Sequence, residues 1–350
     1  GFAAHPYIMM KIFFFVNLTG LIFFLGSGLV KWNSKMVQLV LSAHLGFMVI
    51  WAFVERLISD ELRVVGPSLS STNFAVLLAV AWTIWFINGW ICKHTKMFWL
   101  VLTTLLVFVS ILFSGTRMGI LGMMLGGLLG VLGRMFVTQR QRMMTLLFKF
   151  AIAAGVLAVL GIALWSLVPD DLFLKKGFEG LMSGKLDASS MGRIAAWYTA
   201  VTVIKSHPLW GCGPGNFLIY NAQLLDKFNF IPVVQTLPRL GHAHNLFLMV
   251  LSEHGLIGFS FLGLVVVACF WRLVNYIRRT WDGFGIALLC GGIVTLFLGL
   301  FDVFPLFPSS IGWGAWYMGV LLSLRKDSRT EPRKDSQTEP REDSRTEPRE

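Results

Sequence analysis

The sequence predicts an all-α, polytopic integral membrane protein with about nine transmembrane helices and one long external loop containing amphipathic helices. Of its 350 residues, 55% are hydrophobic and only 14% are charged, and the mean hydropathy is +0.68. Soluble domains carry roughly a quarter charged residues. Apolar runs of about 18 residues recur, and each can cross a hydrocarbon core of about 30 Å as a helix. They are too long and too continuously apolar for the alternating strands of a membrane barrel.

The predicted spans are taken in chain order, and the loops between them set their orientation. They cover roughly residues 8–30, 37–54, 74–92, 97–114, 118–137, 145–168, 255–274, 283–302 and 311–324. Lysines and arginines gather in alternate loops, which the positive-inside rule places in the cytoplasm. These bases are Lys31, Lys35, Lys93, Lys96, Arg134, Arg140, Arg142, Lys149, Arg272, Arg278, Arg279 and Arg325. The other loops mix both signs of charge and are predicted to be external.

The spans group into four regions of the chain. Residues 1–168 hold about six transmembrane helices, 169–243 form an external loop with surface helices, and 244–325 hold about three more spans. Residues 326–350 repeat an octapeptide, "KDSRTEPR KDSQTEPR EDSRTEPR", that has almost no apolar residue to bury, so we expect a disordered cytoplasmic tail. Because the alternation places residue 1 outside, we expect further spans to precede it in the native protein.

Several classes of function are disfavoured. The net charge of +11 is spread over short loops between spans, which reflects topology rather than a nucleic-acid surface. The chain has neither a GxxxxGK[ST] loop for ATP nor an HExxH zinc motif, and its four cysteines form no metal-binding cluster. The glycine-rich "GCGPGN" at 211–216 follows a predicted helix and is interpreted as a turn. These absences disfavour the use of ATP and a structural zinc site.

The long external loop contains a predicted helix. Ile194, Trp197, Val201 and Ile204 recur at helical spacing, which indicates an amphipathic helix lying on the membrane surface. The following "HPLWGCGPGNF" is rich in proline and glycine and is predicted to end this helix.

Two external arginines are candidate anion ligands. Arg117 lies in "LFSGTRMGILGMMLGG" between two spans, where a charged side chain usually has a partner. It could equally be an interfacial arginine that extends to lipid headgroups. Arg193, early in the predicted surface helix, is either solvated or able to clamp a phosphate through two guanidinium nitrogens.

The apolar stretch "HAHNLFLMVLSEHGLIG" at 242–258 carries unusual chemistry. His242, His244 and Asn245 stand at the external mouth of a span, while Glu253 and His254 lie further along. A histidine here can be structural, or it can be a base with a pKa near neutrality. A metal site is disfavoured because His-x-His needs further ligands and no third ligand has a recognisable spacing.

Four stretches together resemble one known family. "HNLFLMVLSEHGLIG" is His-Asn, nine residues, Gly, two residues, Gly, and resembles the signature of bacterial O-antigen ligases. "SGTR" at 114–117 resembles the family's Ser-x-x-Arg at an external helix junction. "MGRIAAWYTAVTVIKSHPLWGCGPGNF" is similar to its external-loop pattern, and "FDVFPLFPSSIG" contains an acidic residue, Asp302, like the one near the family's penultimate span. The resemblance covers most of residues 60–324.

The resemblance implies a lipid-carrier-dependent glycosyltransferase in the bacterial inner membrane with a periplasmic active site. Its donor would be O-antigen polysaccharide on undecaprenyl pyrophosphate, and its acceptor the lipid A core oligosaccharide, without ATP or metal. O-antigen polymerases and protein O-oligosaccharyltransferases share this donor and remain alternatives. A membrane transporter is the alternative of a different class, but the sequence shows no two-fold repeat. The family usually has more spans and begins in the cytoplasm, which agrees with spans preceding residue 1.

The resemblance and the chemistry together suggest a role for each candidate. We expect His244 to be the catalytic base, and Arg117 and Arg193 to bind the donor pyrophosphate, whose leaving charge needs a cation when no metal is present. His242, Asn245 and Asp302 are expected to support them. No residue is expected to bind a metal. Gly255 and Gly258 are interpreted as sites of close packing rather than of substrate contact.

Overall fold

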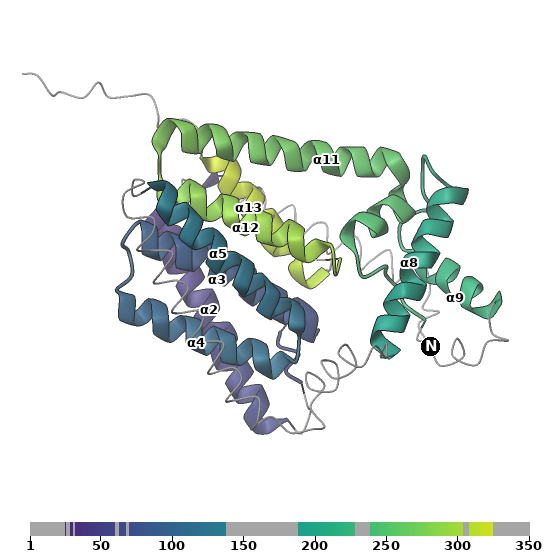
Figure 1. The fold of residues 1–350 in the computed structure, drawn as a ribbon, viewed down its shortest axis with the longest axis horizontal. Coiled ribbons are helices and arrows are strands. Elements are labelled where there is room, and N and C mark those ends of the chain that lie inside the picture. Colours follow the sequence, from purple (N-terminus) through teal and green to yellow (C-terminus); the bar gives the residue numbers. More distant parts are fainter. Residues whose placement is uncertain are drawn as a thin grey trace, which may run out of the picture.

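The computed structural model describes residues 25, 29–30, 32–59, 63–67, 70–137, 188–227, 239–303 and 308–324. Within these ranges the chain is helical and contains no strand. The helices are α2 (Ser34–Ile58), α3 (Ser71–Ile91), α4 (Met97–Ser114), α5 (Arg117–Val137), α8 (Ala188–Ser206), α9 (Phe217–Lys227), α11 (Leu246–Thr280), α12 (Gly283–Gly299) and α13 (Pro308–Ser323). Figure 1 shows α2 to α5, α12 and α13 as a bundle, with α11 extending from it to α8 and α9.

The all-helical fold expected from sequence is confirmed for this part of the chain, and its apolar helices are consistent with a membrane protein, whereas the number of nine spans stays a prediction. Five described helices are long and apolar enough to cross a membrane, namely α2, α3, α4, α5 and α11. Helices α12 and α13 coincide with predicted spans, but with 17 and 16 residues they are shorter than these five helices. The predicted span 145–168, the tail 326–350 and most of the predicted span 8–30 lie outside the described residues.

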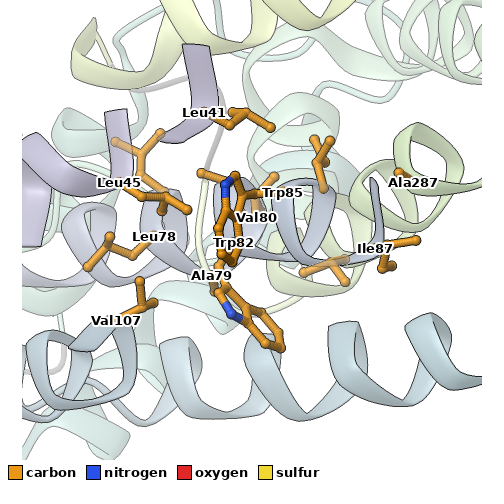
Figure 2. Packing of buried hydrophobic residues seen from close by; sticks show 14 of the residues in the cluster. Leu41, Leu45, Leu78, Ala79, Val80, Trp82, Trp85, Ile87, Val107 and Ala287 are labelled. Carbon is orange, nitrogen blue, oxygen red and sulfur yellow. The ribbon is translucent and has the colours of Figure 1, made fainter. Parts of the chain in front are cut away.

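Helix α3 forms the centre of the bundle because it is apolar on every side. Its buried positions run almost without interruption from Asn73 to Ile91, the pattern expected of a helix covered on all faces. Figure 2 shows its side chains, among them Trp82 and Trp85, meeting those of α2, α4 and α12. The two indoles also satisfy their N–H groups, with Trp82 donating to Thr104 and Trp85 to Ser42.

Helix α5 lies close to α3 through a row of glycines. A methyl group at Gly119 or Gly122 would press on the side chain of Ala75 or Ala79 of α3, and one at Gly126 would overlap Thr83. Small residues allow two helix backbones to approach closely, which is the main source of packing between helices in lipid. The row fixes α5, and with it Arg117 at its first position, against the start of α3.

Helix α11 begins nine residues earlier than the predicted span 255–274. It starts at Leu246 because Asn245 caps it, the side-chain Oδ1 accepting from the amides of Phe247 and Leu248 at 3.0 Å each. The helix is kinked at Gly255, whose φ of 63° and ψ of −166° are not helical. The placement of His244 and Asn245 outside the span is retained, but Glu253 and His254 lie on the helix before the kink.

Helix α8 buries a face of small residues and leaves exposed the face that carries large apolar residues. Ala196, Thr199 and Ala200 are buried against the protein, whereas Ile194, Trp197 and Val201 are exposed. Alanines let α8 lie close to its neighbours, and the large apolar residues are left on the opposite side. That exposed stripe is the one predicted to face a membrane surface, which stays a prediction.

Candidate functional site

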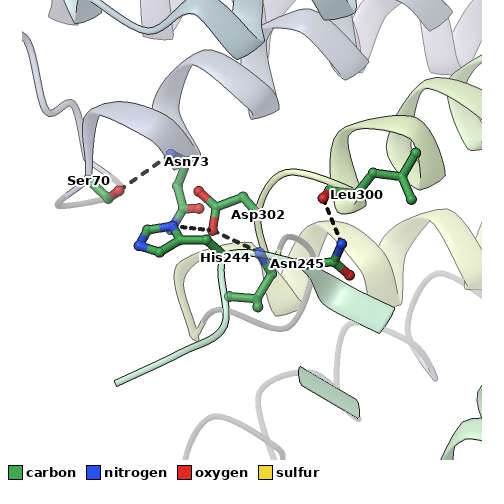
Figure 3. Close-up of polar contacts among 7 residues, drawn as sticks. Ser70, Asn73, His244, Asn245, Leu300 and Asp302 are labelled. Carbon is green, nitrogen blue, oxygen red and sulfur yellow. Dashed lines mark hydrogen bonds and ion pairs between the residues drawn. The ribbon is translucent and has the colours of Figure 1, made fainter. Parts of the chain in front are cut away.

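A buried carboxylate and a histidine meet where the start of α11 approaches the end of α12. Asp302 follows the last turn of α12 and is only 2% exposed. Its Oδ1 lies 3.7 Å from Nδ1 of His244, an ion-pair contact longer than a hydrogen bond. Figure 3 shows the imidazole with this nitrogen toward the carboxylate and its other nitrogen turned away. The pair therefore leaves Nε2 as the nitrogen available to a substrate.

Asn245 fixes the distance between these two residues. Besides capping α11, its Nδ2 donates to the backbone carbonyl of Leu300 at 2.8 Å. The same amide thus ties the first turn of α11 to the end of α12 (Figure 3). Asn245 directly follows His244, and Leu300 precedes Asp302 by two residues. Asn245 was predicted to support the site, and this geometry gives the support a physical form.

The backbone of His244 is held in an unusual conformation. Its φ of 47° lies in the left-handed region, which few residues with a side chain adopt. Such strain persists only where surrounding contacts impose it, and it is frequent at functional sites. The side chain of Asn73, in the first turn of α3, points toward His244 and Asp302 (Figure 3). The imidazole thus has polar neighbours from three separate parts of the chain.

Arg193 approaches this pair from helix α8. Ala196 and Ala200 of α8 pack with Ala243, the residue between the two histidines. One turn earlier on α8, Arg193 is close enough to His242 for its positive charge to act on that imidazole. Its Nε is buried and has no hydrogen-bond partner among the described residues. A buried guanidinium nitrogen without a partner is costly and indicates a place for an anion.

The two flanking groups have shifted protonation equilibria. Burial first, then the charges of His244 and Arg193, lowers the pKa of His242 to about 4, although Asp302 acts in the opposite direction. Burial alone would raise the pKa of Asp302, but His244, His242 and the amide of Val303 outweigh it and lower that pKa. At neutral pH the site therefore holds a neutral His242 beside an ionised carboxylate.

Arg117 lies at the same end of the bundle, beside a second arginine. The side chain of Arg63 packs against Gly115, two residues before Arg117, and the loop that carries Arg63 is anchored by a hydrogen bond from Val64 N to Phe113 O of 3.0 Å. Burial first, and then the charge of Arg117, lowers the pKa of Arg63. The structure therefore brings Arg193, His242, His244 and Asp302 together and adds Arg63 beside Arg117.

The loop between α8 and α9 fits into the kink of α11. In an unbroken helix Leu256 N would bond to Ser252 O, and Ile257 N to Glu253 O. All four groups instead bond to residues 208–213: the two amides to the carbonyls of Pro208 and Leu209 at 2.9 and 3.3 Å, and the two carbonyls to the amides of Cys212 and Gly213 at 2.8 and 2.9 Å. "GCGPGN" is therefore a turn, as predicted, and it completes the hydrogen bonding of a broken membrane helix.

The same junction accounts for Glu253 and for the two glycines of the stretch 242–258. The carboxylate Oε1 of Glu253 accepts from the amide of Phe217 at 3.3 Å, at the start of α9. A Cβ at Gly255 would overlap the carbonyl of Leu209, and Gly258 makes room for the side chain of His254. Close packing between helices was the predicted role of these glycines, but Gly255 instead accommodates a loop and Gly258 a side chain of its own helix.

Three ligating groups that the sequence did not connect meet at this site. His242, His244 and Asp302 each offer a ligand atom, and these atoms lie within 4.8 Å of one another. The ring centroids of the two histidines are 4.1 Å apart. No third partner for His-x-His was predicted, because Asp302 is distant along the chain. These are the residues that fit a metal ion in the described part of the chain.

Two residues of the site were missed by sequence reasoning. Asn73 is an amide in the first turn of an apolar span, and Arg63 is one of several charges of both signs in the loop before α3. A buried amide in a membrane helix is a signal that could have pointed to Asn73. Nothing in the sequence separates Arg63 from its charged neighbours, because its significance comes from packing beside Gly115.

The fold and the site define an integral membrane protein that gathers a histidine, a carboxylate and arginines at one end of its helices, as an enzyme acting on an anionic substrate would. Residues 102–263 match the family model described as O-antigen ligase. Over this segment the chain is similar to the O-antigen ligase family, whose members are glycosyltransferase-like enzymes. The match contains Arg117, Arg193 and His244 and ends before Asp302. A search among curated proteins finds no match.

Proposed function

We propose that the protein is an O-antigen ligase of the bacterial inner membrane. It transfers O-antigen polysaccharide from undecaprenyl pyrophosphate to the lipid A core oligosaccharide at the periplasmic face, with inversion at the transferred sugar. The observation that carries the proposal is Arg193, whose buried Nε lacks a partner next to the His242–His244–Asp302 cluster. A guanidinium group with an unused donor next to a base suits a donor substrate whose leaving group is a pyrophosphate.

The acceptor is activated at His244. Asp302 holds Nδ1, so Nε2 takes the proton of the acceptor hydroxyl as its oxygen forms the new bond to the anomeric carbon of the donor. The bond from that carbon to the phosphate oxygen breaks at the same time, and undecaprenyl pyrophosphate leaves with the electron pair. Attack opposite the leaving group inverts the anomeric centre. The ionised Asp302 then stabilises the imidazolium that results.

The arginines receive the charge that develops on the leaving group. Arg193 is placed beside the base, and Arg117 at the start of α5 contributes a second cation with Arg63 adjoining it. Arginine can bind two phosphate oxygens at once, and a site away from water increases the strength of each contact. The donor already carries its activation, so the proposed reaction uses neither ATP nor a metal ion.

The deciding experiment is reconstitution of the full chain in liposomes with lipid-linked O-antigen and a lipopolysaccharide that lacks O-antigen. Glycan on the lipid A core supports the ligase proposal. A longer lipid-linked glycan would identify a polymerase, and glycan on an added protein acceptor an oligosaccharyltransferase. We expect transfer to continue in EDTA, and a strict need for a divalent ion would contradict the role given to the arginines.

A further inference from the structure

The cluster of His242, His244 and Asp302 has the composition of a transition-metal site. Imidazole nitrogens and a carboxylate are the usual ligands of Zn²⁺, and two imidazoles disfavour Mg²⁺ and Ca²⁺, which prefer oxygen. Zinc sites with three protein ligands leave a fourth position open to water or an added ligand. The cluster therefore supplies the number and the type of ligands that one zinc ion requires.

The geometry is close to what coordination needs. Ligand atoms that share one zinc ion in a tetrahedron lie about 3.4 Å apart, given bonds of about 2.0–2.1 Å. Here the three atoms lie within 4.8 Å of one another, and the pair His244 Nδ1 and Asp302 Oδ1 is at 3.7 Å. Asp302 is buried and the histidines are half-buried. Movements of the ligand atoms by about 1.4 Å or less, through small rotations about side-chain bonds, would close the set.

We infer that His242, His244 and Asp302 bind one divalent transition-metal ion, Zn²⁺ or a similar ion, and that the ion inhibits the enzyme. Binding is independent of the proposed function, whereas inhibition rests on it. A metal ion bound to Nδ1 of His244 would take the position that Asp302 needs to orient the base, and it would place a positive charge on the imidazole that must accept a proton.

Arg193 sets the strength of the site. Its positive charge acts on His242 and opposes a second cation there. A ligand set of one carboxylate and two neutral imidazoles next to an arginine should bind zinc less tightly than the same set alone. Removal of the Arg193 charge should therefore tighten zinc binding, which is opposite in direction to the loss expected when a ligand is removed.

The test measures metal binding by the full chain in nanodiscs, purified without a polyhistidine tag and without donor or acceptor. Zn²⁺ affinity comes from competition with a chromophoric chelator, and Co²⁺ reports ligand geometry through its visible absorption. We expect one ion per chain, at least tenfold weaker binding in His242→Ala and in Asp302→Asn, and severalfold tighter binding in Arg193→Gln. His207→Ala, an exposed histidine of the same external region, is the matched control and should bind as the parent does.

Absence of stoichiometric binding, or equal binding by the parent and both ligand variants, would overturn the site. Using two ligand variants guards against a folding defect in either, and the elution volume of each checks its fold. A second measurement follows transfer activity as Zn²⁺ is added and then removed with EDTA. Reversible inhibition that His242→Ala weakens supports the inhibitory role. Stoichiometric binding without inhibition would keep the metal site but overturn both its inhibitory role and the assignment of His244 as base.

Discussion

Asn245 donates from its side-chain amide to the backbone carbonyl of Leu300 at 2.8 Å, and this single bond joins the start of α11 to the end of α12. Asn245 directly follows His244, and Leu300 lies two residues before Asp302. A shift of one helix end would therefore move the other through this hydrogen bond. A residue that touches no substrate in this arrangement can still control the distance between base and carboxylate.

Asn245→Asp should separate the two roles of this side chain. An aspartate can still accept from the amides of Phe247 and Leu248, and its charge suits a helix N-terminus, so stability should change little. It cannot donate to Leu300, so kcat should fall by about tenfold or more, as misplaced catalytic groups are costly. Asn245→Ala loses both roles and should also lose about 1 kcal/mol of stability. Unchanged kcat in Asn245→Asp would contradict the positioning role.

His244→Ala should abolish transfer while expression and donor binding remain. General bases contribute roughly 10²–10⁴-fold to rate, so product formation should fall by at least that range. Glycan transfer by purified protein is the measurement, with labelled donor retention on the protein as a second one. His207→Ala is the matched control and should stay active. Ligation at the parental rate by His244→Ala would disprove the assignment of the base.

Arg193→Ala should reduce donor use by about 10²-fold, the usual loss when one charge-stabilising donor is removed. Arg193→Lys keeps the charge but not the paired contacts, so it should recover only part of the rate. Steady-state kinetics with varied lipid-linked donor would show the difference. If lysine restores full activity, the guanidinium makes no paired contact with phosphate. If alanine is fully active, Arg193 does not bind the donor.

Gly255→Ala should destabilise the protein strongly. The position has a φ of 63°, and a Cβ there would overlap the carbonyl of Leu209 in the loop that fills the kink. Gly263→Ala is the matched control on the same helix, because an added Cβ meets nothing within 4 Å there. Thermal unfolding in detergent should show a clear loss for Gly255→Ala and none for Gly263→Ala. Equal unfolding temperatures would mean that the loop does not hold the kink.

Acid should weaken the fold through His242. Its pKa is about 4 in the folded protein and near 6.5 in the unfolded chain, so between these values the unfolded chain binds more protons. Stability therefore rises with pH across this window and is lost as pH falls through it. Replacing the imidazole in His242→Gln should flatten the unfolding temperature between about pH 4 and pH 6.5. The experiment is done in EDTA, and an unchanged slope would contradict the shift.

Composition and charge pattern predicted most of the fold. Helix α4 covers the same residues as its predicted span, and α5 differs from its prediction by one residue, because a continuous apolar run between charged loops leaves little freedom in lipid. The predicted start of the span that corresponds to α11 was wrong by nine residues. Asn245 caps the helix ahead of Glu253 and His254, two polar residues that interrupt the apolar run. The break at Gly255 comes from the positive φ that glycine permits.

The candidate site was predicted in its parts but not in its assembly. His244 and Arg193 followed from a resemblance and from the chemistry of their side chains. The partnership of Asp302 with His244 depends on two helix ends meeting, and spacing along the chain does not contain that information. Arg63 and Asn73 were missed for the same reason, since packing alone distinguishes them from similar residues nearby.

The loop inserted at the kink also constrains how this region can vary and how it is made. External loops usually tolerate insertions and deletions. Between Pro208 and Gly213, however, four backbone groups bond to α11, so a change of length by one residue would misalign that set. Synthesis begins at the N-terminus, so this loop leaves the ribosome before α11 does. The four bonds at the kink can therefore form only after α11 has followed the loop.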